Sequence, residues 1–104
     1  MYARVARWEG QDPELLRQAA EAIRRQAEAG ERPQQVPVVG GTMLVDYDKG
    51  TSVAIMLFET EDDLRQSHEV LNAMTPDFDT GGRRVSVDLF EVAMDVRPSQ
   101  GAPA

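Results

Sequence analysis

The sequence contains no cysteine and only one histidine, and both scarcities narrow the chemistry open to it. Without thiols the chain has no disulfide, no thiolate metal site and no cysteine nucleophile, which fits a reducing compartment. The clustered carboxylates of the stretch TEDDL have no histidine beside them at metal-ligand spacing. Glycine-rich phosphate loops, serine nucleophile elbows and complete calcium-loop patterns are also absent. We therefore expect neither a cofactor nor a metal ion.

Basic residues are few relative to acidic ones, and long apolar runs are missing. Eleven Lys and Arg against 18 Asp and Glu give a formal net charge of −7, so a phosphate backbone is repelled by the chain as a whole. No apolar run approaches the roughly 18 residues of a membrane span, and Met1 leads directly into strand-like sequence. We expect a cytoplasmic protein with neither nucleic acid nor a membrane as a partner.

The pattern of apolar residues and turn signals predicts six elements in the order βαββαβ. Asp12 and Pro13 are typical of a helix start, and Thr60 followed by Asp63 resembles a capping box. Glycines Gly40 and Gly41 indicate a bulge or a close backbone approach near the start of the second strand. The expected elements are a strand over 2–9, a helix over 13–30, strands over 38–47 and 53–58, a helix from about 61 to before 76, and a strand over 84–96.

This order predicts one α+β domain over residues 1–96 with a ferredoxin-like βαββαβ arrangement, followed by a disordered tail over 97–104. In that arrangement a four-stranded antiparallel sheet carries both helices on one face. The helices therefore leave the second face of the sheet without cover from the same chain.

The third strand is nevertheless apolar on both faces, because Val53–Phe58 is an unbroken apolar run. Val53, Ile55 and Leu57 point to one side, and the intervening residues point to the other. Monomers seldom leave an apolar patch of this kind in water. We therefore predict a homodimer in which two sheets pack face to face.

The stretches YARVARWEG, GGTMLVDYDKG, VAIMLFETEDDL, NAM and GGRRVSVDLFEV together resemble the dimeric α+β barrel superfamily, in the neighbourhood of the antibiotic-biosynthesis monooxygenase-like domains. The resemblance implies a dimer whose two sheets close into a barrel. It also implies a small-molecule pocket between the helices and the sheet of each subunit. The superfamily includes cofactor-independent monooxygenases, haem-degrading enzymes, lactone isomerases and many members of unknown role.

His68 is the candidate catalytic residue, because its side chain alone has an unperturbed pKa near neutrality. It follows Leu64 by four and precedes Leu71 by three, so it should face the space under the helices. A base there could deprotonate a phenol or enol, and the resulting carbanion would react with oxygen. The competing interpretation is a structural histidine that is hydrogen-bonded in the core or at its edge.

Tyr2, Arg4 and Trp8 share one face of the first strand and are candidate substrate-binding residues. If this face lies under the helices, they form an aromatic wall with a cation. If it is the opposite face, Trp8 anchors the dimer interface. A pairing of Arg4 with Asp88 of the last strand, across neighbouring strands, is the structural alternative.

Asn72 is the remaining candidate for the site, because haem-degrading relatives combine a histidine, a tryptophan and an asparagine. This chain holds Trp8, His68 and Asn72, but at positions that do not match that motif residue by residue. Haem binding or haem degradation is therefore a minor alternative. Arg83 and Arg84 could attract an anionic substrate, although neighbouring strand residues point to opposite sides.

Two functional hypotheses follow from the sequence. One is a cofactor-independent monooxygenase-like enzyme acting on an aromatic or polyketide-like substrate, with His68 as base. The other is a non-catalytic dimeric module that binds a small molecule or serves only in assembly. An open cavity containing His68 would favour the enzyme, whereas side chains filling that space would favour the module.

Overall fold

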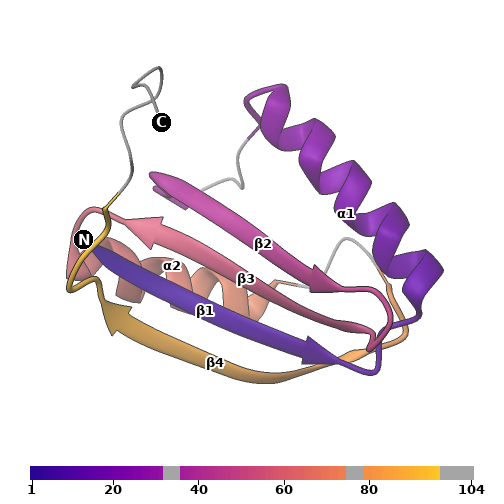
Figure 1. Cartoon of the computed structure of the whole chain (residues 1–104). Coiled ribbons are helices and arrows are strands. Elements are labelled where there is room, and N and C mark those ends of the chain that lie inside the picture. Colours follow the sequence, from indigo (N-terminus) through magenta and orange to yellow (C-terminus); the bar gives the residue numbers. More distant parts are fainter. Residues whose placement is uncertain (32–35, 75–78, 97–104) are drawn as a thin grey trace.

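The computed structural model describes residues 1–31, 36–74 and 79–96, and it confirms the predicted order of strands and helices (Figure 1). The tail predicted over 97–104 lies outside the described residues. The elements are β1 (Tyr2–Glu9), α1 (Pro13–Glu28), β2 (Gly40–Asp46), β3 (Thr51–Phe58), α2 (Glu61–Ala73) and β4 (Arg83–Glu91).

Both helices begin where the capping residues predict. Asp12 Oδ1 accepts hydrogen bonds from the backbone N–H groups of Glu14 and Leu15, each at 3.0 Å, and Pro13 follows as the first residue of α1. Thr60 Oγ1 accepts from the Asp63 N–H at 3.1 Å at the start of α2. These side-chain oxygens satisfy backbone donors that have no partner within the helix, which fixes the first turn of each helix.

The four strands form one antiparallel sheet in the order β2-β3-β1-β4, so β3 and β1 are central. The β2–β3 register is unbroken, and Gly41 is explained by close approach: a Cβ there would lie 3.2 Å from the Ile55 carbonyl oxygen. The sheet has its register shift between β1 and β4 instead, at Arg7 and Trp8. Both β2 and β4 are shorter than predicted, and β4 ends at Glu91 rather than Val96.

Helix α2 lies behind the sheet in the view of Figure 1 and packs against β1 and β3. Leu64 from α2 meets Phe58 from β3 and Val36 in the buried core, and Tyr2 and Met56 pack against this cluster from the sheet. This side of the sheet is called the helix side below. The core on the helix side explains why Phe58 and Met56 are apolar.

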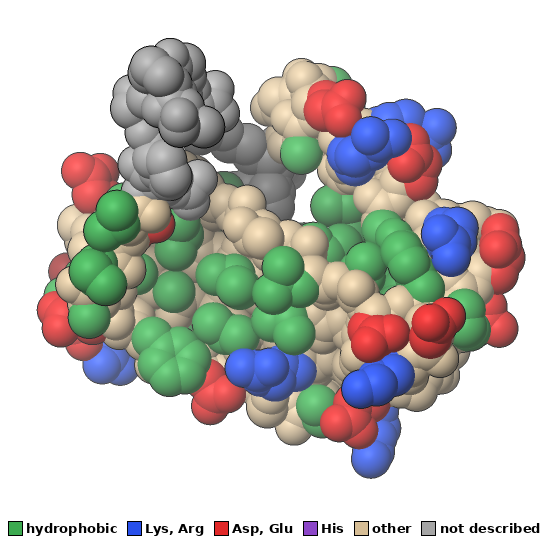
Figure 2. Space-filling model, in the orientation of Figure 1, with side chains coloured by type: hydrophobic (Ala, Val, Ile, Leu, Met, Phe, Trp, Pro, Cys, Tyr) green, Lys and Arg blue, Asp and Glu red, His purple; other side chains and the backbone are tan. Residues whose placement is uncertain are grey.

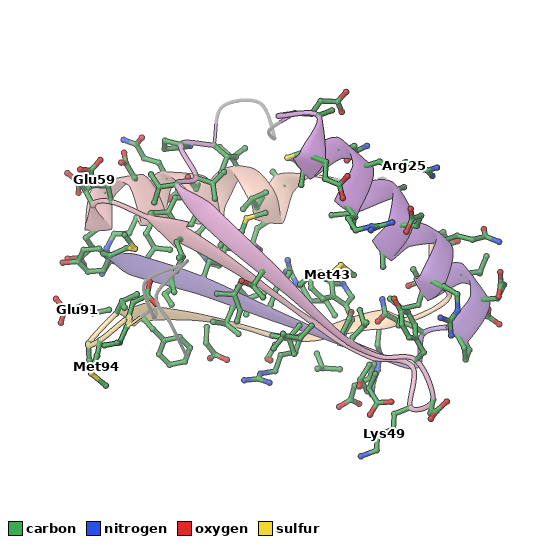
Figure 3. All side chains as sticks on the ribbon, turned by 45° about the horizontal axis from the view of Figure 1, so that its top comes forward. Arg25, Met43, Lys49, Glu59, Glu91 and Met94 are labelled. Atoms are coloured by element: carbon green, nitrogen blue, oxygen red, sulfur yellow. The ribbon has the colours of Figure 1, made fainter. Side chains whose placement is uncertain are left out.

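Helix α1 is anchored mainly at its N-terminal end. The Gln11 N–H donates to the Gly50 carbonyl at 2.9 Å, and the Arg17 guanidinium lies 4.1 Å from the centre of the Tyr47 ring. Toward its C-terminal end the helix diverges from the sheet in both ribbon views (Figures 1 and 3). The apolar side chain of Leu16 near its start is accordingly buried, whereas that of Ile23 in its second half is 37% exposed.

The opposite side of the sheet has no cover from the described residues and is called the open face. Figure 2 shows hydrophobic side chains gathered over the middle of this face, with acidic and basic side chains mostly toward its margins. Leu44 and Phe90 are each 51% exposed. The register assigns to this face the apolar side chains of Val5, Leu44, Val53, Ile55, Leu57 and Phe90. The prediction that β3 is apolar on both faces is therefore confirmed.

Candidate functional site

Three of the five predicted site residues meet on the helix side, where they form what we call the Arg4 cluster. Arg4 Nε donates to His68 Nδ1 at 3.3 Å, and Arg4 Nη2 donates to Asn72 Oδ1 at 3.2 Å. Asn72 Nδ2 lies 3.1 Å from His68 Nε2. The two helix residues are thus joined to each other and to one guanidinium on the central strand β1.

Strand alternation and helix periodicity place these three side chains together. Arg4 points to the helix side and lies opposite Met56 of β3 and Leu89 of β4. His68 and Asn72 are one turn apart on α2, so their side chains are neighbours on the helix surface. The predicted contact between Arg4 and Asp88 is wrong, because Asp88 lies opposite Val5 and shares the open face with it.

The Arg4 cluster has fewer hydrogen-bond acceptors than its contacts require. A neutral imidazole has one acceptor nitrogen and one N–H, and the amide of Asn72 adds one acceptor oxygen. Because Nδ1 accepts from Arg4, the proton of neutral His68 lies on Nε2 and faces the amide nitrogen of Asn72. Turning the Asn72 amide over would only move the conflict to Arg4 Nη2. One of the contacts therefore sets a donor against a donor.

Arg4 is a buried cation that pairs with no carboxylate in the described part of the chain. Its exposed fraction is 5%, and the ion pairs formed within the described part of the chain do not include it. Burial lowers the pKa of Arg4, and the positive charge of Arg84 lowers it further. Desolvating a charge is costly unless an opposite charge compensates it, so Arg4 is an unusual residue to retain for stability alone.

His68 is half-buried and responds to the same positive field. Burial lowers the pKa of His68 first, Arg4 and Arg84 lower it further, and Glu69 opposes them weakly by raising it. A proton added to His68 would also remove the acceptor that Arg4 uses. His68 is therefore a neutral imidazole at neutral pH.

We predict that the imidazole of His68 titrates below its usual pKa of about 6.5 in the folded protein. Since the unfolded chain then binds the proton more readily, the contribution to stability is complete above about pH 6.5 and is lost as the pH falls through the folded pKa. An NMR titration of this one histidine measures its pKa directly. A His68→Gln variant should lose this part of the acid sensitivity, and a midpoint at or above 6.5 would contradict the assigned environment.

Tyr2 and Trp8 lie on the same side of the sheet as Arg4. Tyr2 packs against the buried core, and the regular β1–β3 register places Trp8 opposite Ser52 on the helix side. The interpretation of Trp8 as an anchor between packed sheets is therefore wrong, because that interface would use the open face. On β4 the partner of Trp8 is Arg84, which accounts for the position of this second cation near the Arg4 cluster.

A groove of about 280 Å³ lies beside the Arg4 cluster, between α2 and β4. Its lining includes Tyr2, two residues from Arg4 on the same face, and Leu64, one helical turn from His68. Leu89, the cross-strand partner of Arg4, also lines it. The remaining lining residues are Glu61, Arg65, Phe90 and Glu91. A second hollow of about 540 Å³ lies on α1 and is lined by Arg17, Gln18, Glu21 and Arg25.

The pocket expected between both helices and the sheet is not either of these hollows, and neither is lined by His68. Helix α1 diverges from the sheet toward its C-terminal end (Figure 3), and the residues that line each hollow come either from α1 alone or from β1, α2 and β4. The labelled side chain of Met43 projects from β2 toward the region between the two helices in that view.

One residue near the site, Ser67, escaped the sequence reasoning, and the position of a second, Arg84, was not predicted. Ser67 is fully buried on α2, and its Oγ has no hydrogen-bond partner within the described residues. Its spacing of three from Leu64 was a usable signal, because that spacing places both on the buried stripe. Arg84 was considered only as one of two neighbouring arginines, since its register with Trp8 depends on a bulge that the sequence did not reveal.

The arrangement of the described residues limits how a metal ion or haem could bind. Within residues 1–31, 36–74 and 79–96, no three His, Asp or Glu side chains gather closely enough to hold a metal ion. Both ring nitrogens of His68 are engaged by neighbouring side chains, so an axial bond to haem iron would have to displace Arg4 or Asn72. Neither described helix combines the length and apolarity that crossing a membrane requires.

In comparisons with known proteins, no family model and no curated sequence matches this chain. The geometry of the Arg4 cluster and of the open face is therefore the basis for the function proposed below.

Proposed function

We propose that this protein is a small-molecule-binding homodimer of the dimeric α+β barrel type, with its binding site at the Arg4 cluster. The observation that carries the proposal is the buried guanidinium of Arg4, which is held against His68 and Asn72 and forms no ion pair with a carboxylate of the described residues. Such a group destabilises the folded chain unless a ligand uses it. Strained or electrostatically unfavourable positions of this kind concentrate at functional sites.

The open face supports the dimer. Four strands about 4.8 Å apart, each about eight residues long, cover roughly 500 Å² per copy, or about 1,000 Å² for two copies. That total is at the lower limit of stable protein interfaces. Because the apolar residues occupy the middle of the face and charged side chains lie mostly at its margins, a second copy meets apolar surface with apolar surface (Figure 2).

A catalytic form of the proposal is a cofactor-independent monooxygenase-like reaction on an aromatic or polyketide-like substrate. His68 would take the proton of a phenol or enol, and the resulting carbanion would give electrons to oxygen. His68 is neutral, as a base must be, but the lone pair on Nδ1 is held by Arg4. This contact favours the alternative of a non-catalytic binding module unless the ligand draws Arg4 away.

Native mass spectrometry of the purified protein tests the proposal, because it reports the number of subunits and any retained molecule together. We expect the mass of a dimer. We also expect that a retained molecule is lost from His68→Ala and kept in Gln66→Ala, a change at an exposed position of the same helix. A monomer at all concentrations, or equal retention in both variants, would contradict the proposal. A retained mass equal to haem would favour the minor alternative.

A further inference from the structure

We propose that the Arg4 cluster recognises the carboxylate of a small organic acid whose apolar body lies in the groove between α2 and β4. This inference rests on the proposed function, that the cluster binds a small molecule, and it names the chemical class of that molecule. Three features favour such a ligand: the hydrogen-bond balance of the cluster, its charge, and the lining of the adjoining groove.

The hydrogen-bond balance calls for added acceptors. Arg4 offers two N–H groups to the cluster, and Asn72 and neutral His68 offer more, while only Asn72 Oδ1 and His68 Nδ1 accept. A carboxylate brings two acceptor oxygens and no donor, and it matches the planar fork of a guanidinium. Binding of a carboxylate therefore removes the donor-against-donor contact. A neutral amine or alcohol would add a further donor.

The positive charge of the site also favours an anionic ligand. The chain as a whole carries a net charge of −7, yet the pKa values of Arg4 and His68 are lowered by Arg84, and Arg4 itself lowers the pKa of His68. Among the described acidic residues, Glu69 raises the pKa of His68, but less than burial, Arg4 and Arg84 each lower it. An acidic protein that places two arginines near one histidine, Arg4 buried and Arg84 exposed, presents an electropositive site to anions.

The groove provides space for the apolar body of the ligand. Tyr2, Leu64 and Leu89 give apolar walls, and each is a direct neighbour of Arg4 or His68 along the strand, along the helix or across the sheet. At the far rim, Glu61 is paired with Arg65 at 2.7 Å, and Glu91 adds negative charge. A carboxylate is repelled at that rim and attracted at Arg4, so the acid group enters toward the Arg4 cluster. A volume of about 280 Å³ is near the lower end for ligand pockets and fits a compact ring system.

The ligand also changes His68. When a carboxylate accepts the N–H groups of Arg4, Nδ1 of His68 loses its donor and its lone pair is freed. The added negative charge opposes the fields of Arg4 and Arg84 and favours the protonated imidazole. The pKa of His68 therefore rises on binding, and this rise is a readout that a merely structural histidine would not give.

The test compares 1-naphthoate with its neutral isostere 1-naphthamide, using calorimetry on the full chain and the NMR titration of His68. We expect 1-naphthoate to bind at least about tenfold more tightly than the amide and to raise the pKa of His68. Arg84→Gln should weaken 1-naphthoate several-fold, whereas Arg83→Gln, the same charge change at the neighbouring exposed position, should leave the affinity unchanged. Arg4→Gln should remove the preference for the acid.

The outcomes separate this inference from the proposed function. Equal affinity for the acid and the amide overturns the inference but leaves a small-molecule site at the cluster. Equal losses in Arg84→Gln and Arg83→Gln overturn it as well, because net charge alone would then explain binding. Failure of both probes to bind at millimolar concentration overturns the inference and the proposed site together. If Arg4→Gln does not fold, the comparison of Arg84→Gln with Arg83→Gln and the comparison of 1-naphthoate with 1-naphthamide still test the inference.

Discussion

The Leu44→Asp variant should be a monomer at concentrations where the unaltered protein is a dimer. Leu44 lies on the open face opposite Val53 and is 51% exposed in the single chain. An aspartate there leaves the core of the monomer untouched but places one unpaired carboxylate per copy in the proposed sheet-to-sheet interface. Desolvating these charges should raise the dissociation constant of the dimer by more than about 100-fold. Sedimentation velocity across a concentration series measures the shift.

Leu15→Asp is the matched control for Leu44→Asp. Leu15 is 41% exposed on α1 and is not part of the open face. The Leu15→Asp variant introduces the same charge at a similarly exposed leucine. Because Leu15 lies outside the open face, the variant should leave the dimer intact. Dissociation of both variants would point to a general effect of charge on assembly. An intact dimer in Leu44→Asp would exclude the open face as the interface.

The Arg4→Met variant should be more stable than the unaltered protein while losing the binding site. Methionine fills a similar volume and removes a buried cation that has no carboxylate within the described residues. His68 and Asn72 can then hydrogen-bond to water, because His68 is half-buried and Asn72 is exposed. We expect the free energy of unfolding to rise by about 1 to 2 kcal/mol, measured by urea denaturation at fixed protein concentration.

Lys49→Met separates this effect from the loss of one positive charge. Lys49 is exposed in the turn between β2 and β3, outside both the Arg4 cluster and the open face. It should change stability by less than about 0.5 kcal/mol. A clear loss of stability in Arg4→Met would mean that the guanidinium is a structural element, and the functional reading of its burial would fail.

The fold was predictable because local signals agreed with one another. Asp12 and Thr60 fixed the starts of the helices, and the apolar run of β3 required cover on both faces. The position of α1 was less predictable, because its stripe of Leu16, Ala20, Ile23 and Ala27 suggests packing along its whole length. Divergence of its second half is a tertiary property that periodicity does not record.

The site was only half predictable. Alternation grouped Tyr2, Arg4 and Trp8 on one face, but which face looks toward α2 depends on tertiary packing. The bond between His68 and Arg4 joins positions 64 residues apart, so no local pattern contains it. The pairing of Arg4 with Asp88 failed for the same reason: a cross-strand neighbour one register step away lies on the opposite face.

The buried guanidinium of Arg4, which pairs with no carboxylate of the described residues, is the feature that unites these results. Local structure, core packing and turn chemistry all favour the same fold, and the Arg4 cluster is where polar satisfaction departs from that agreement. The shortage of hydrogen-bond acceptors in the Arg4 cluster follows from the protonation state of His68.

The most direct test is the ¹⁵N spectrum of the His68 imidazole at neutral pH, recorded without and with 1-naphthoate. Because the chain has one histidine, the signals need no assignment. We predict a neutral ring with its proton on Nε2 in the free protein, and a change at Nδ1 that saturates with the ligand. A protonated ring, a proton on Nδ1, or a spectrum unaffected by bound 1-naphthoate would contradict the Arg4 cluster as a carboxylate-binding site.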